Sequence, residues 1–141
     1  MKQVTSLLMK RGWNRRVLTN DDFDEWCERD GVMVMEEEIE YPGFYLIRNT
    51  QPVIVLNKKL RGIERQIVAW HEYGHHVLHV PNGRFFCLDN IDKAEYQAHL
   101  IAAIALIPRP DLFRPLSELQ EEGYPLDFLR FRSRVFDQFK I

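Results

Sequence analysis

Residues 71–75 read His71-Glu72-Tyr73-Gly74-His75, an H-E-x-x-H motif, and the interpretation of the chain starts from it. On an α-helix, two histidines four residues apart lie on the same face, so both rings can bind one metal ion. Glu72 lies about 100° further round the helix, where a general base can accept a proton from an attacking water molecule. The motif therefore predicts a metal-dependent hydrolytic site, with His71 and His75 as ligands and Glu72 as the catalytic base.

The motif has a simpler interpretation as a surface helix that carries two solvated histidines. The residues around it are bulky and apolar: Ile67, Val68, Trp70, Val77 and Leu78. Such flanks are typical of a buried helix, and buried histidines need partners, which one metal ion supplies to both at once. The flanking sequence therefore favours the metal site.

The sequence on either side of this helix predicts an α+β fold in a single domain over residues 1–141. Three short apolar runs, at 32–35, 44–47 and 53–56, are typical of strands, and the short connections between them favour an antiparallel meander. Helical periodicity and capping signals predict helices over 20–30, 62–80, 93–107, from the Ser117 capping box to Gly123, and over 125–139. We therefore expect a small three-stranded antiparallel sheet packed on a helical bundle.

Composition limits the classes of function. The chain is 45% hydrophobic and 28% charged, with a formal net charge of −2. It therefore lacks the excess of basic residues that would indicate nucleic acid as a partner. The longest apolar run, Leu100–Ile107, is far shorter than the about 20 residues that cross a bilayer, and the N-terminal apolar run is too short for a signal peptide. We therefore expect a cytoplasmic protein without membrane contact, in which Cys27 and Cys87 are reduced thiols.

A catalytic zinc site needs a third protein ligand besides the two histidines. His79 continues the same helix face, but the rise of about 12 Å between His71 and His79 is too long for one ion to bind both. Glu95 opens the next predicted helix, and a helical hairpin would bring it across the histidine face. Glu95 also completes a capping box at 92–95, in which it only reaches back to the helix start. Spacing alone does not choose between these two roles.

His99 lies four residues after Glu95, on the same face of that helix. Two roles are open to it: it is either a hydrogen-bond partner of a metal ligand or itself the third ligand. His99, Tyr73 and Tyr96 are also the candidate donors to an oxyanion formed during hydrolysis, and the sequence does not choose among them.

The last predicted helix carries Arg130, Arg132 and Arg134, which indicate either an acidic partner or a solvated face. The solvated face is favoured because the apolar residues of this helix form an inward stripe: Leu129, Val135, Phe136 and Phe139.

Two motifs in the correct order resemble the ImmA/IrrE-type family of zinc metallopeptidases. The family pattern is an H-E-x-G-H helix, often followed by a further histidine, and then a helix that reads roughly E-x-x-A-N-x-F-A-A-x-L-L-M-P. The first motif is His71 to His75, with His79 in the extra place, and the second runs from Glu95 to Pro108. The likeness spans about residues 32–108, and it departs from the pattern where His99 replaces the asparagine and Ile101 the phenylalanine.

The resemblance implies a zincin-like fold and a zinc ion bound by His71, His75 and Glu95, as in gluzincins, with Glu72 as catalytic acid and base. It also implies a regulatory protease of narrow specificity, whose protein substrate is a repressor-type transcription factor. A strand at 53–56, if it lies at a sheet edge over the site, is expected to hold that substrate in an extended form.

Three other functions remain open on the same motifs. One is a non-catalytic regulator that binds a partner protein, and another is a toxin–antitoxin component from a mobile element. In the third, zinc is a structural staple with four protein ligands, for which His99 or His79 would supply the fourth.

Overall fold

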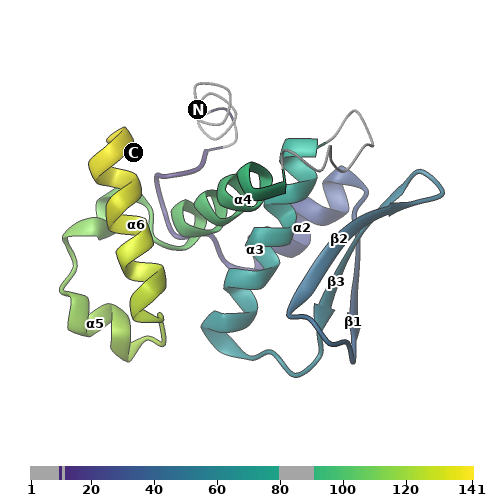
Figure 1. Ribbon diagram of the computed structural model, residues 1–141, viewed down its shortest axis with the longest axis horizontal. Helices are drawn as coiled ribbons and strands as arrows, with labels where there is room; N and C mark the ends of the chain where they lie inside the picture. Colours follow the sequence, from purple (N-terminus) through teal and green to yellow (C-terminus); the bar gives the residue numbers. More distant parts are fainter. Residues whose placement is uncertain (1–9, 11, 80–90) are drawn as a thin grey trace.

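The computed structural model describes residue 10, residues 12–79 and residues 91–141. Its elements are α2 (Asn20–Asp30), β1 (Met33–Glu37), β2 (Gly43–Arg48), β3 (Gln51–Asn57), α3 (Gly62–His79), α4 (Ile91–Leu106), the 3₁₀ helix η2 (Arg109–Phe113), α5 (Leu116–Glu121) and α6 (Leu126–Phe139). The predicted α+β class is confirmed. The sheet lies at one end of the molecule, α5 and α6 lie at the other, and α3 and α4 lie between them (Figure 1).

The sheet is mixed, so the predicted antiparallel meander is wrong. The strand order is β1-β3-β2, with β3 in the centre, antiparallel to β2 and parallel to β1. The link between β1 and β2 does not turn back on β1; it crosses the end of β3. The Asn57 side-chain amide fixes this crossing by donating to the backbone oxygens of Ile39 at 3.0 Å and Tyr41 at 3.2 Å. The strand predicted at 53–56 is therefore central, and it is not the sheet edge that a substrate would meet.

The tight turn between β2 and β3 follows from two residues with left-handed backbone conformation. Asn49 has φ 50° and Thr50 has φ 67°, which match the two central positions of a hairpin turn whose twist suits the flanking strands. The turn places Arg48 opposite Gln51 and sets the register in which Tyr45 pairs with Ile54.

Helix α2 begins and ends as the sequence predicts, because Thr19 caps it in a capping box with Asp22 and Gly31 ends it at φ 72°. The predicted Ser117 capping box is wrong, since α5 starts after Pro115 without a side-chain cap. Helix α4 already includes Ile91, so Asp92 lies inside the helix and not at the cap position that would make Glu95 a capping residue.

The core is built around three tryptophans that contact one another. The ring of Trp13 lies 5.4 Å from the rings of Trp26 and Trp70, centroid to centroid, and Trp70 also meets Phe23 edge to face. This cluster attaches the N-terminal segment and α2 to α3. Cys27 is buried among these residues as a free thiol, whereas Cys87 lies outside the described residues. Among the described helices, none is long and apolar enough to cross a membrane.

Candidate metal centre

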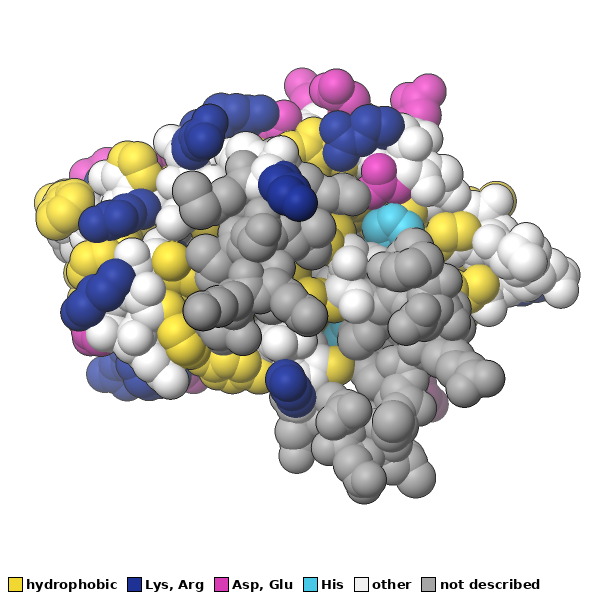
Figure 2. Space-filling model, turned by 90° about the horizontal axis from the view of Figure 1, so that it is seen from above, with side chains coloured by type: hydrophobic (Ala, Val, Ile, Leu, Met, Phe, Trp, Pro, Cys, Tyr) yellow, Lys and Arg dark blue, Asp and Glu magenta, His cyan; other side chains and the backbone are white. Residues whose placement is uncertain are grey.

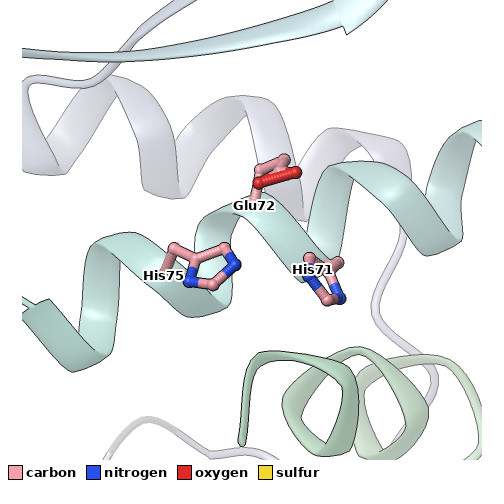
Figure 3. Close-up of side chains that lie close together, drawn as sticks. All are labelled: His71, Glu72 and His75. Carbon is pink, nitrogen blue, oxygen red and sulfur yellow. The ribbon is translucent and has the colours of Figure 1, made fainter. Parts of the chain in front are cut away.

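Helix α3 presents the motif residues in two directions. The rings of His71 and His75 project from the side of α3 nearer α4, whereas Glu72 projects towards the sheet (Figure 3). The candidate ligand atoms of the three residues all lie within 4.8 Å of one another. His75 is 2% exposed and Glu72 is 5% exposed, so the alternative of two solvated histidines on a surface helix does not fit this structure.

Glu95 of α4 lies opposite both histidines. Its Oε2 atom is 2.9 Å from Nε2 of His71, and its Oε1 atom is 2.8 Å from Nε2 of His75. Both rings therefore direct the same nitrogen at one carboxylate, whose side chain is 52% exposed. The helical hairpin that the sequence predicts brings Glu95 to the histidine face.

Gly74 explains how α4 comes close enough for this contact. A Cβ atom at this position would lie 3.1 Å from Cα and 3.2 Å from the carbonyl oxygen of Ala98. The glycine and the alanine let the two helix backbones meet, and Glu95 lies one turn before Ala98 on α4. The glycine of the H-E-x-G-H motif is thus a packing requirement of the helix pair.

The environment of Glu72 favours its protonated form. Burial and, to a smaller extent, repulsion by the nearby Glu95 carboxylate together raise the pKa of this carboxyl to about 8. A carboxyl with a pKa near neutrality can both accept and return a proton, as a general acid–base group must. Gly43 lets β2 lie against this residue, because a Cβ atom there would be 2.8 Å from Val68 Cγ1 and 3.5 Å from Glu72 Cγ.

A cleft of about 390 Å³ opens over these residues. One wall is β2 with the residue before it, and the others come from α3 and α4; the lining is Pro42, Gly43, Phe44, Tyr45, Ile67, Val68, His71, Glu72, His75, Glu95 and His99. The candidate ligands and the candidate base therefore face one space that can hold a substrate.

His99 lines this cleft, whereas the other two candidate oxyanion donors do not. Its ring lies 5.9 Å from that of His71 and 4.4 Å from that of Phe131 on α6, centroid to centroid. Burial lowers the pKa of His99, which favours the neutral ring with one N–H donor. Tyr73 donates its hydroxyl to Asp30 at 2.6 Å on another face of α3, and Tyr96 packs against Phe131. The side chain of His79 lies outside the described residues.

Sequence reasoning missed a second polar cluster behind the motif. The hydroxyl of Tyr45 lies 3.0 Å from Nδ1 of His76, and Nε2 of His76 lies 3.4 Å from Oδ2 of Asp30, the atom that accepts the Tyr73 hydroxyl. The spacing of Tyr73 and His76 indicates one helix face. Their partners stand far away in the sequence, on α2 and β2, and no local pattern identifies them.

A buried H-E-x-x-H helix, a carboxylate from the next helix and an adjoining cleft together define a candidate metallopeptidase site. Residues 27–126 match the model of the peptidase M78 family, described as the IrrE N-terminal-like domain. This match covers more than half of the chain, and the chain belongs to that family, as its motifs predict.

The chain is also similar to a phage protein. It is 36% identical over 73 residues to "Uncharacterized immunity region protein 2" of Bacillus phage phi105. The alignment covers 49% of this chain and 46% of that protein, so the chain spans about half the length of this relative. No solved structure matches the chain significantly.

Proposed function

We propose that the chain is a zinc-dependent peptidase in which His71, His75 and Glu95 hold the metal ion. The convergence of both imidazole Nε2 atoms on one carboxylate carries this proposal. Two imidazole nitrogens and a carboxylate oxygen form a donor set that zinc accepts, and three protein ligands leave a position for water or substrate. His99 is assigned to the cleft wall and not to the ligand set, because both histidine rings face Glu95.

Glu72 is the proposed acid and base of the reaction. When bound, the metal would act as a Lewis acid that activates water and polarises a peptide carbonyl. Glu72 takes a proton from the attacking water and delivers it to the leaving amine, and its raised pKa suits both transfers. The neutral ring of His99 is placed in the cleft to donate a hydrogen bond to the developing oxyanion.

Strand β2 is the proposed guide for the substrate backbone. It is an edge strand of the sheet, and its residues from Gly43 to Tyr45 line the cleft. An edge strand has unpaired backbone N–H and C=O groups, to which an extended peptide can add as a further strand. Strand β2 therefore takes the substrate-holding role that the sequence assigned to the strand at 53–56, because that strand is central in the sheet.

The proposed substrate is a repressor-type transcription factor, cleaved at few sites. The similarity to a protein named for a phage immunity region supports a regulatory role. Cleavage at few sites also agrees with a cleft of limited size whose guide is a single short strand.

The test is metal content, measured by mass spectrometry on purified protein dialysed against zinc. We expect about one zinc ion per chain for the wild type and near none for His75→Ala and Glu95→Gln, because three ligands are needed. His99→Ala is the matched control and should keep the ion. Loss of zinc in His99→Ala with retention in Glu95→Gln would move the third ligand to His99, and a wild type that binds no zinc would contradict the peptidase proposal.

A further inference from the structure

Helices α5 and α6 enclose a groove at the end of the molecule remote from the sheet. Two adjoining depressions, of about 450 Å³ and 190 Å³, share the lining residues Leu116, Leu129 and Ser133, and we call them together the α5–α6 groove. Leu116 is 52% exposed, and the neighbouring Phe113 is 85% exposed. A groove with an exposed leucine in its lining, beside an exposed phenylalanine, offers apolar surface to a partner.

The positive charge of the groove lies on the α6 wall. Arg130 and Arg134 line its wider part and stand four residues apart, so they share one face of α6. Among the described residues, neither guanidinium is within ion-pair distance of a carboxylate. Arg114, on the opposite side, is different because three carboxylates surround it: Asp111, Glu118 and Glu122. The α6 side of the groove therefore carries two cations without an ion-pair partner among the described residues. The carboxylates around Arg114 outnumber it, but none of them lines the groove.

A third guanidinium lies beneath the narrower part of the groove. Arg132 is 1% exposed, and it donates through Nε to the Ile107 carbonyl at 2.5 Å and through Nη2 to the Ile141 backbone oxygen at 2.8 Å. Its Nη1 atom has no hydrogen-bond partner within the described part of the chain, and no described side-chain carboxylate pairs with it. Arg132 is therefore held by backbone oxygens beneath the groove and is too buried to contact a partner directly.

On the face drawn in Figure 2, basic and hydrophobic side chains lie side by side at the left end of the molecule, with acidic side chains at its margin. Asp127 and Asp137 of α6 do not line the groove.

We propose that the α5–α6 groove binds an acidic amphipathic segment of a partner protein. Leucine-type side chains of the segment lie on Leu116 and Leu129, and its carboxylates face Arg130 and Arg134. Helix-in-groove docking of this kind needs an apolar floor and charges on one rim, and both are present. A nucleic acid fits less well, because two exposed cations neutralise few phosphates. Docking here requires no cleavage, so the proposal is independent of the proposed peptidase activity.

The test is fluorescence anisotropy with the full chain and a labelled model peptide of about 15 residues, with leucines and glutamates on opposite helix faces. We expect saturable binding that weakens about tenfold or more in R130E/R134E, because attraction becomes repulsion at both positions. The charge-matched control R15E/R48E changes two exposed arginines outside the groove and should bind within about twofold of wild type. R130K/R134K keeps the charges and should retain most of the binding.

Two further measurements test whether binding depends on the charge of the peptide and where on the protein it takes place. The same peptide with lysine in place of glutamate should not bind, and amide shifts of ¹⁵N-labelled protein on peptide addition should centre on α5 and α6. Circular dichroism melting curves establish that each variant is folded. The proposal is overturned if wild type shows no saturable binding, if the lysine peptide binds equally, if R15E/R48E weakens binding as much as R130E/R134E, or if the shifts centre on the metal cleft.

Discussion

Helix α3 carries two histidine–carboxylate clusters on different faces. The clusters differ in whether solvent can reach them and in whether their donor atoms point at one place. On the face towards α4, His71 and His75 direct their Nε2 atoms at Glu95, and the group opens into a cleft. Behind it, His76 lies between the hydroxyl of Tyr45 and the carboxylate of Asp30. In the first cluster several donors meet at one point that solvent can reach, and in the second the polar groups face one another within the core.

This difference separates a candidate metal site from a structural network built of the same residue types. A metal ion needs convergent donors and an entry path, which only the first cluster offers among the described residues. The second cluster joins α2, β2 and α3 through Asp30, Tyr45 and His76. Its contribution is to hold the wall of the cleft, because Tyr45 lines that wall from β2.

The largest effect is expected from removing the base on the metal side. Glu72→Gln should reduce peptide hydrolysis by about 10²–10⁴-fold, because no group then accepts the proton of the attacking water. Zinc content should stay at the wild-type level, since Glu72 is not among the proposed ligands. Hydrolysis can be followed with a library of internally quenched peptides, and the biological effect of the variant can be measured beside it. A variant that keeps its biological effect would favour a docking regulator over an enzyme.

The comparison itself can be tested with one amide substitution in each cluster. Glu95→Gln should lose zinc with little change in the stability of the metal-free protein, because its side chain is half exposed. Asp30→Asn should keep zinc but lower the free energy of unfolding by about 1–3 kcal/mol, because the half-buried Asp30 carboxylate, which contacts Tyr73 and His76, becomes a weaker acceptor. Urea unfolding of the metal-free forms and zinc titration measure both quantities. If Asp30→Asn also lost zinc, the two clusters would be one functional unit.

The two clusters also show which contacts could be predicted from the sequence and which could not. His71, Glu72 and His75 follow a helical spacing, and Glu95 belongs to a second motif in register with it, so the contact of Glu95 with the two histidines was predictable. Asp30 and Tyr45 reach His76 only through tertiary packing, and no local pattern reports such contacts. The prediction of the sheet order was wrong for the same reason. The link after β1 crosses β3 because of tertiary hydrogen bonds from Asn57, which no local pattern reports.

The arginines of α6 also show that a local sequence pattern does not report tertiary contacts. Arg130 and Arg134 are exposed as the solvated-face interpretation predicts, but Arg132 is 1% exposed and bonded to backbone oxygens. Alternate residues on a helix point in different directions, so three arginines in such a run cannot share one face. The inward turn of the middle arginine depended on acceptors in Ile107 and Ile141, which lie outside the helix.

A stability effect of similar size is expected at Gly74, where α3 and α4 meet through their backbones. In an open helix, glycine to alanine stabilises by about 0.5–1 kcal/mol. Gly74→Ala should instead destabilise by about 1–3 kcal/mol, because the added methyl group meets the backbone of Ala98 at 3.1 Å. Zinc affinity should fall with it, since α4 carries Glu95. Thermal unfolding with and without zinc gives both quantities, and a stabilised variant would mean that α4 does not approach α3 so closely.

The smallest effect is expected at Asp22, which lies in the α2 capping box remote from both clusters. Hydrogen bonds from Arg16 and Thr19 hold the pKa of this carboxyl well below its usual range, with Arg16 the main cause. A carboxyl whose pKa is lower in the folded state contributes stability above its unfolded pKa of about 3.9, and the contribution is lost as the pH falls below that value. Asp22→Asn should therefore lower stability by about 1 kcal/mol at pH 7, and the difference from wild type should narrow at pH 3.5. Urea unfolding of the metal-free proteins at both pH values measures this difference, and zinc content should be unchanged at pH 7. An equal difference at both pH values would show that the cap acts through its shape and not through its charge.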